Sequence, residues 1–158
     1  MAKLIAHRGL TTGPSKDHEN RISTLIAARQ SGFDVEFDVW YKDSKWWLGH
    51  DAPVQEIEFD WLCMFDQDSP LDDHHAWVHA KNIEALFMLR RMNFQGHYFF
   101  HDNDAAVLTS SGFLWTYPGQ HLTSLSICLM PEWNGMLDSV ASLNVYAVCS
   151  DYVEQMRG

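Results

Sequence analysis

Basic residues are scarce in this sequence, and long apolar runs are missing from it. Eleven Lys and Arg stand against 21 Asp and Glu in 158 residues, which gives a formal net charge of −10. A surface of this charge repels nucleic acids and anionic membranes, because phosphate groups bind to clustered Lys and Arg. No segment approaches the ~18 consecutive apolar residues of a membrane-spanning helix. We therefore expect no nucleic-acid partner and no membrane span.

Cysteine is also rare. The three cysteines, Cys63, Cys128 and Cys149, are odd in number and lie in apolar stretches. This pattern predicts reduced packing residues rather than disulfides, and it favours a cytoplasmic protein. The N-terminal MAKLIAHRG has one Lys followed by a short apolar run. We expect this run to form a first strand rather than a signal peptide.

The sequence does contain an alternation of short apolar runs with helix-length segments. With 46% apolar and 20% charged residues, the whole chain, residues 1–158, matches one globular domain. Helices are expected over residues 20–32, 83–92 and 133–143. This order predicts an α/β protein, a reduced TIM-like (β/α) barrel with about seven parallel core strands instead of eight. The expected strands are residues 3–7, 35–39, 77–80, 97–100, 113–117, 126–130 and 145–149.

One local pairing departs from this parallel pattern. Asp43-Ser44 predicts a tight turn, so residues 35–41 and 45–48 are expected to form an antiparallel hairpin. The acidic segment that follows, residues 51–73, is expected to be irregular, with one weak helical patch around residues 59–64.

Polar residues recur at the carboxyl ends of the expected strands. Parallel α/β proteins place their catalytic residues at these ends, so the recurrence predicts one shared site. The residues concerned are His7-Arg8, Glu36 and Asp38, His50-Asp51, His79-Ala80-Lys81, and His101-Asp102.

Glu36 and Asp38 are the strongest candidates for metal ligands. They flank one apolar residue in a strand, so both side chains point to the same side of the sheet. Two adjacent carboxylates in a barrel lumen cannot both stay ionised without a cation, and a hard divalent ion with oxygen ligands is the natural partner. The alternative is a solvated edge strand with outward carboxylates. The apolar row of Val35, Phe37 and Val39 on the other side favours the cation.

His7 and His50 are candidates for proton transfer near neutral pH. Each of them, taken alone, is better explained by a structural or surface role. As a pair that brackets the two carboxylates, they suit a general acid and a general base. Arg8 offers fixed cationic donors for phosphate, and Lys81 offers a compact point charge.

The remaining candidates have two interpretations each. His101 either contacts substrate or is a surface residue. Trp115 either stacks on a sugar or glycerol group or fills the core. Asn20 is expected to cap the first helix. Asp151 either caps the last turn or faces the site, and Glu132 is expected in the first turn of a helix.

Four segments of the first third of the chain resemble the glycerophosphodiester phosphodiesterase family, whose fold is a phospholipase-C-like (β/α) barrel. The later resemblance is limited to Ala80-Lys81 and residues 148–152. The resemblance implies that His7 and His50 are the acid/base pair. The four segments are LIAHRG at residues 4–9, His18-Glu19-Asn20, Glu36-Phe37-Asp38-Val39, and Gly49-His50-Asp51.

The same resemblance implies a divalent metal ion, Mg²⁺ or Ca²⁺, on Glu36 and Asp38, with Arg8 and Lys81 on the phosphate. Where the family has a third acidic ligand, this chain has His79, a softer donor. With His79 as the third ligand, the ion is expected to be weakly held, to be Mn²⁺-like, or to recruit another oxygen. The chain is also short for the family, so the barrel is expected to be incomplete or completed by a partner subunit in a homo-oligomer.

The sequence therefore predicts a metal-dependent phosphodiester hydrolase that acts on a small phosphodiester substrate. One alternative is a catalytically silent sugar-phosphate-binding or regulatory module on the same barrel. Another is a different metal-dependent hydrolase that uses the acidic pair.

Overall fold

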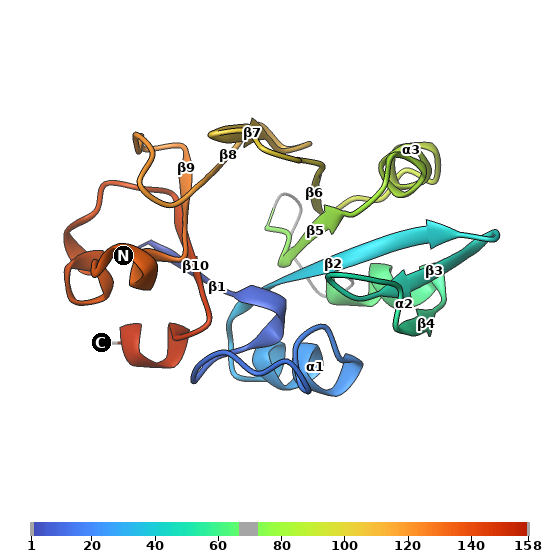
Figure 1. Cartoon of the computed structure of the whole chain (residues 1–158), viewed down its shortest axis with the longest axis horizontal. Helices are drawn as coiled ribbons and strands as arrows, with labels where there is room; N and C mark the ends of the chain where they lie inside the picture. The colour runs from blue at the N-terminus through green and yellow to red at the C-terminus, as the bar shows by residue number, and fades with distance from the viewer. Residues whose placement is uncertain (1, 67–72, 158) are drawn as a thin grey trace.

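The computed structural model describes residues 2–66 and 73–157 of the chain (Figure 1). In these residues ten strands form one sheet, with three α-helices and five 3₁₀ helices around it. The strands are β1 (Lys3–Ala6), β2 (Asp34–Lys42), β3 (Lys45–Leu48), β4 (Gln55–Ile57), β5 (Ala76–Ala80), β6 (His97–Phe99), β7 (Ala106–Leu108), β8 (Leu114–Thr116), β9 (Ser126–Leu129) and β10 (Ala147–Ser150).

The helices are short and unevenly distributed. The α-helices are α1 (Ile22–Gln30), α2 (Phe59–Cys63) and α3 (Ile83–Arg91). The 3₁₀ helices are η1 (His7–Gly9), η2 (Met64–Asp66), η3 (Pro131–Asn134), η4 (Leu137–Ser142) and η5 (Val153–Met156).

The sheet is mixed and stays open. Its path runs β4-β3-β2-β1-β10-β9-β8-β7, and β5 pairs with both β2 and β6. The pairs β2·β3, β3·β4 and β7·β8 are antiparallel, and the other pairs are parallel. The sheet curls until β7 and β8 come round opposite β2 (Figure 1), but no ladder joins β6 to β7 in the described residues.

The prediction of a reduced TIM-like barrel with seven parallel strands is therefore wrong. The chain forms a curled half-barrel of mixed strands with few helices. The expected helix over residues 133–143 is replaced by η3 and η4, because Gly135 takes a left-handed backbone (φ 65°) that ends η3. The strands β4 and β7 were not expected, since three residues are too few to show an alternating pattern.

Other local predictions are confirmed. Asp43 and Ser44 both have positive φ, 53° and 62°, as a two-residue hairpin turn between β2 and β3 requires. The helices α1 and α3 lie within the expected ranges, and α2 occupies the weak helical patch. Residues 67–72 of the expected irregular segment lie outside the described residues.

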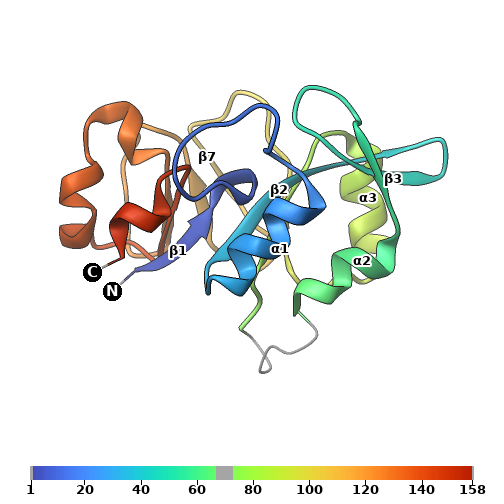
Figure 2. The same cartoon turned by 90° about the horizontal axis from the view of Figure 1, so that it is seen from below.

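The side chains on the two faces of β2 have different surroundings. Val35, Phe37 and Val39 are fully buried in a core with Leu25 of α1 and Leu89 of α3. These helices cover the outer face of the sheet, and Figure 2 shows α1 and α2 on that side. Because strand side chains alternate, Glu36 and Asp38 point to the concave face.

A second hydrophobic core fills the concave face near the amino ends of the parallel strands. It contains Ile5, Trp77, Phe99, Trp115 and Ile127, all buried. The concave face is therefore filled by side chains toward the amino ends of the parallel strands and open at their carboxyl ends. Within residues 2–66 and 73–157, none of the helices has the length and hydropathy that a membrane-spanning helix requires.

Candidate functional site

A cavity of about 430 Å³ lies at the carboxyl ends of the parallel strands. It brings together all the site residues predicted from the sequence, although they come from six separate segments of the chain. The structure shows that these residues lie close together, and their roles remain predictions. The lining consists of His7, Arg8, Glu36, Asp38, His50, His79, Lys81, His101 and Trp115, together with Phe100, Asp102, Tyr117, Leu129, Met130 and Trp133.

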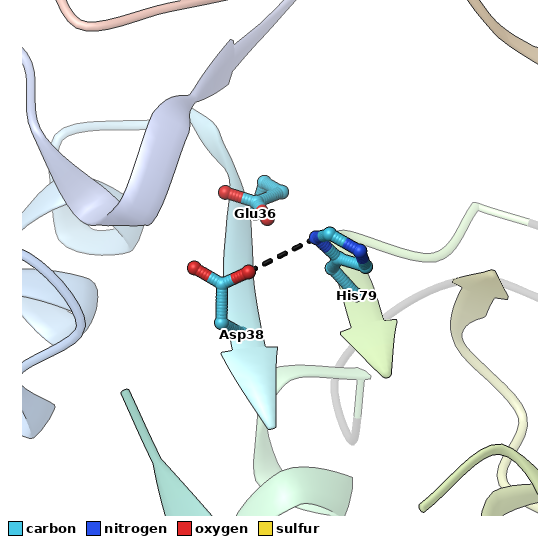
Figure 3. A group of neighbouring side chains, drawn as sticks. All are labelled: Glu36, Asp38 and His79. Atoms are coloured by element: carbon cyan, nitrogen blue, oxygen red, sulfur yellow. Dashed lines mark ion pairs between the residues drawn. The ribbon is translucent and has the colours of Figure 1, made fainter. Parts of the chain in front are cut away.

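The strand register places three possible metal ligands side by side. Asp38 of β2 pairs with His79 of β5, and Glu36 lies two residues before Asp38 on the same face. One ligand atom from each of the three residues lies within 4.8 Å of the others (Figure 3). All three side chains are buried, so the cluster is shielded from bulk water.

Asp38 is surrounded by positive charge. Its side chain is 1% exposed, and its oxygens lie 3.0 Å from His79 Nδ1, 3.4 Å from Arg8 Nε and 3.6 Å from Lys81 Nζ. Burial alone would raise the pKa of Asp38. The contact with His79 and the charges of Lys81 and Arg8 outweigh burial and hold the pKa well below its usual range. Asp38 is therefore ionised.

Glu36 is in the opposite electrostatic situation. Burial, and then the negative charge of Asp38, raise its pKa above the ordinary value. One of its oxygens accepts a hydrogen bond from the backbone N–H of Arg8 at 3.0 Å. The positive groups around Glu36 thus do not fully compensate a negative charge on this buried carboxyl group.

The three residues fit a divalent cation. Asp38 Oδ1 is buried and accepts no well-formed hydrogen bond from any residue that the structure describes, although His79 Nδ1 and Lys81 Nζ lie within ion-pair distance of it. This oxygen can therefore still act as a ligand of a cation. A cation bound there would also stabilise the ionised form of Glu36. The donor set of two carboxylates and one imidazole is chemically able to hold such an ion.

His7 belongs to a second cluster at the end of β1 and β10. Its Nδ1 lies 2.8 Å from Asp151 Oδ1. Burial alone would lower the pKa of His7, but the hydrogen bond with Asp151 and the charge of Glu36 raise it above its ordinary value. Asp151 does not line the cavity itself, but it contacts a histidine that does, and it does not cap the last helix.

Glu132 holds Asp151 in place. It lies in the first turn of η3, as expected, and its carboxylate accepts hydrogen bonds from Ser150 Oγ at 2.8 Å and from the Asp151 backbone N–H at 3.2 Å. This function of Glu132 was not predicted. It joins segments eighteen and more residues apart, which no local pattern shows.

We predict that Asp151→Asn lowers the pKa of His7, because it removes the negative charge nearest to the imidazole. A raised pKa stabilises the fold below the unfolded value near 6.5, and this contribution is lost as pH rises through the folded value. In the variant, that pH-dependent stabilisation shrinks. The measurement is an NMR titration of the histidine ring protons in protein treated with EDTA. Asp51→Asn is the matched control, and an unchanged His7 pKa in Asp151→Asn would contradict the prediction.

His50 lies directly after β3 and is more accessible than His7. Its side chain is 30% exposed, and its Nδ1 lies 2.7 Å from Asp51 Oδ1. Burial, together with the positive charges of Arg8 and Lys81, lowers its pKa despite the opposing charge of Asp38. The pKa values of His7 and His50 are therefore shifted in opposite directions.

Asn20 does not cap the first helix, so this expectation is wrong. The residue before α1 is Arg21, which makes no side-chain cap. Asn20 Nδ2 instead donates to Asp38 Oδ2 at 2.8 Å, and the Asp38 backbone N–H donates to Asn20 Oδ1 at 2.9 Å. The neighbouring Glu19 binds Arg8 Nη1 at 2.8 Å. Glu19 and Asn20 therefore orient the residues around the acidic pair, whereas His18 is exposed and contacts Ser15.

We predict that Asn20→Gly lowers the free energy of unfolding by about 2–3 kcal/mol, because two hydrogen bonds to a buried partner are lost. Asn20 has φ 55°, which glycine adopts freely, so backbone strain does not contribute. Asn93 also has φ 55° but is exposed, which makes Asn93→Gly a matched control with little expected effect. Equal losses in the two variants, measured by denaturant unfolding, would disprove the role of Asn20.

Aromatic residues form the other wall of the cavity. His101 stacks on His79 with ring centroids 4.9 Å apart, and its Nε2 is hydrogen-bonded to Tyr117 Oη. Burial, with the charges of His79 and Lys81, lowers the pKa of His101 to about 4. Trp115 is only 2% exposed and stacks on Phe99, so most of its ring fills the core.

Trp133 was missed by the sequence analysis. It lies on η3 at the cavity and is 69% exposed. A large apolar side chain this exposed beside a polar cavity suggests contact with a bound molecule. The expected long helix over residues 133–143 obscured this position.

Comparisons of the chain with protein-family models, with curated proteins and with solved structures found no match.

Proposed function

We propose that this chain is a metal-dependent phosphodiester hydrolase that resembles the glycerophosphodiester phosphodiesterases. One observation carries the proposal. The buried cluster of Glu36, Asp38 and His79 shares a cavity of about 430 Å³ with further histidines and two cationic side chains. The histidines used in the proposal are His7 and His50, and the cationic side chains are Arg8 and Lys81. An anionic phosphodiester, a divalent ion and a pair of proton-transfer groups match these three sets of residues.

Each set has a separate task. Arg8 and Lys81 attract the phosphate and offset the overall acidity of the chain at this one place. Glu36, Asp38 and His79 hold the ion, which when bound polarises the phosphate and the attacking oxygen.

His7 and His50 move protons, one removing a proton from the attacking hydroxyl or water and one donating a proton to the leaving alcohol. Asp151 fixes the orientation of the His7 ring, since it contacts Nδ1 and leaves Nε2 for the substrate.

The substrate class is a small phosphodiester. A cavity of about 430 Å³ is in the range that holds one small molecule. Its aromatic wall suits a sugar or glycerol group. The second candidate function, a silent sugar-phosphate-binding or regulatory module, is favoured by one observation: the ionised Asp38 already contacts Arg8 and Lys81.

The test uses EDTA-treated protein and a chromogenic phosphodiester, with Mg²⁺, Ca²⁺ or Mn²⁺ added back. We expect turnover that depends on the added ion and that is lost in Lys81→Met, with His121→Ala, an exposed residue outside the cavity, unchanged. Stabilisation by sugar phosphates without turnover of any phosphodiester in a substrate screen would support the binding module and contradict the hydrolase.

We also propose a cytoplasmic location. Cys128 and Cys149 are buried thiols, and burial raises the pKa of both. Buried, protonated thiols used for packing are typical of proteins in reducing compartments.

We predict that the protein forms a homodimer or a larger assembly. The sheet has open edges, and Leu108 on the edge strand β7 is 67% exposed. Such an edge promotes pairing between chains unless another surface covers it. Light scattering at micromolar concentration should show the assembly, and Leu108→Lys should shift it toward monomer. A clean wild-type monomer would contradict the prediction.

A further inference from the structure

The ligand cluster of Glu36, Asp38 and His79 contains one nitrogen donor in addition to oxygen. His79 lies on β5 directly opposite Asp38 on β2, and its ring points to the acidic pair (Figure 3). Mg²⁺ and Ca²⁺ prefer oxygen ligands only, whereas imidazole is a good ligand for first-row transition metals. The identity of the third ligand therefore bears on which ion the site selects.

The orientation of His79 is fixed before any ion binds. Its ring stacks on Phe99 with centroids 5.0 Å apart and planes 14° apart, and on His101 at 4.9 Å and 20°. Phe99 is in turn stacked on Trp115 at 4.4 Å. A ring held by packing loses little freedom on binding, which strengthens coordination by its nitrogen.

The charge balance of the site points in the same direction. Hard cations such as Ca²⁺ bind more tightly as the number of negatively charged ligands increases. Here Arg8 and Lys81 lie 3.4 and 3.6 Å from Asp38 and reduce the net negative charge that an ion meets. The attraction of the ion by charge alone is weakened, so the bond to an imidazole nitrogen contributes a larger share of the binding free energy.

We propose that this site selects a first-row transition-metal ion over Mg²⁺ and Ca²⁺, and that His79 is the residue that sets this preference. Mn²⁺, the ion of this series that is most similar to Mg²⁺ and Ca²⁺ in its preference for oxygen ligands, is the probe in the experiments below. The inference depends on the proposed function, in which the cluster holds the catalytic ion. It adds which class of ion the site takes and which residue decides it.

The first experiment measures coordination directly. EDTA-treated wild-type protein is loaded with Mn²⁺ alone, and pulsed electron paramagnetic resonance records the magnetic coupling to ligand nitrogen. We expect a histidine nitrogen signal that disappears in His79→Gln and persists in His50→Gln, which removes a different imidazole from the same cavity. The wild-type measurement alone shows whether a histidine nitrogen binds the ion, and the two variants, confirmed as folded by circular dichroism, assign that nitrogen to His79.

The second experiment measures selectivity by calorimetric titration of Mg²⁺, Ca²⁺ and Mn²⁺. In His79→Gln, the Mn²⁺ affinity should fall at least ~10-fold, the scale reported for losing a group that supports a metal site. The Mg²⁺ affinity should fall less, since Mg²⁺ keeps several waters as ligands. His79→Asp should shift the preference toward Mg²⁺ and Ca²⁺.

The outcomes separate this inference from the proposed function. Bound Mn²⁺ without a histidine nitrogen signal, or an unchanged Mg²⁺-to-Mn²⁺ affinity ratio in His79→Gln, overturns the inference and leaves a metal-dependent hydrolase. If none of the three ions binds to the wild type at millimolar concentration, the metal-dependent function itself is contradicted, and the inference falls with it.

Discussion

Replacing His7 or His50 with Ala should lower turnover of a phosphodiester by at least ~100-fold, the usual scale of one general acid or base. Both side chains line the same cavity, and each has a carboxylate partner on its Nδ1. The double variant should lose much less than the product of the two single losses, because residues that act as a unit are not additive. Steady-state kinetics of the three variants measure this.

The pH dependence of the same rate supplies a second readout. The pKa of His50 is lowered and that of His7 is raised, so neutral His50 and protonated His7 coexist at pH values between the two. The rate should fall on the acid side as His50 becomes protonated, and on the alkaline side as His7 loses its proton. His50→Ala should remove the acidic limb and His7→Ala the alkaline limb.

Controls separate catalysis from stability. His121→Ala changes a histidine that is exposed and outside the cavity, so its kinetics should match the wild type. Near-normal turnover by His7→Ala, with a folded protein by circular dichroism, would refute the mechanism.

Glu36→Gln and Asp38→Asn should abolish the stabilisation of the protein by divalent ions. Each substitution removes a negative charge and weakens an oxygen donor in a site with only two carboxylates. At an ion concentration of ~100 Kd, binding stabilises the wild type by about 2.7 kcal/mol. For a chain of this size, that stabilisation raises Tm by roughly 5–10 °C. The measurement is thermal unfolding with and without Mg²⁺, Ca²⁺ or Mn²⁺.

A matched control and a further arm accompany these variants. Asp60→Asn makes the same charge change on the exposed side of α2, and it should keep the full response to the ion. Asp102→Asn tests whether Asp102, which lines the cavity, supplies an additional oxygen. An equal rise in Tm in the wild type, Glu36→Gln and Asp38→Asn would mean that the ion binds elsewhere.

The sequence was informative about the site because the positions of its residues depend on local rules. Alternation in β2 places Glu36 and Asp38 on one face, and parallel strands bring the residues that follow β1 and β5 to one edge. His50, which follows β3, reaches the same place because the antiparallel hairpin of β2 and β3 returns the chain to Asp38. The partners of these residues were harder to predict. Asp151 contacts His7 across 144 positions of the chain, and the capping interpretation of Asn20 was locally reasonable but lost to its pairing with Asp38.

The fold was predicted less well than the site. The expected strands form, but closure of a barrel depends on how the segment after β6 is built. After β6 the chain forms the antiparallel pair β7·β8. Farther along, Met130 and Gly135 have a left-handed backbone, and short 3₁₀ helices form in place of the expected α-helix. Such conformations depend on individual residues and give no periodic signal, so a pattern of apolar residues cannot reveal them.

The position of β1 between β2 and β10 has a consequence for synthesis in the cell. The ribosome produces β1 first and β10 last, so one edge of β1 stays without its partner until Ala147–Ser150 emerges. Contacts between distant segments slow folding, and an unpaired strand edge promotes aggregation in the meantime. The His7–Asp151 pair forms in the same late step. Truncated chains that lack β10 therefore contain neither a complete sheet nor a complete site.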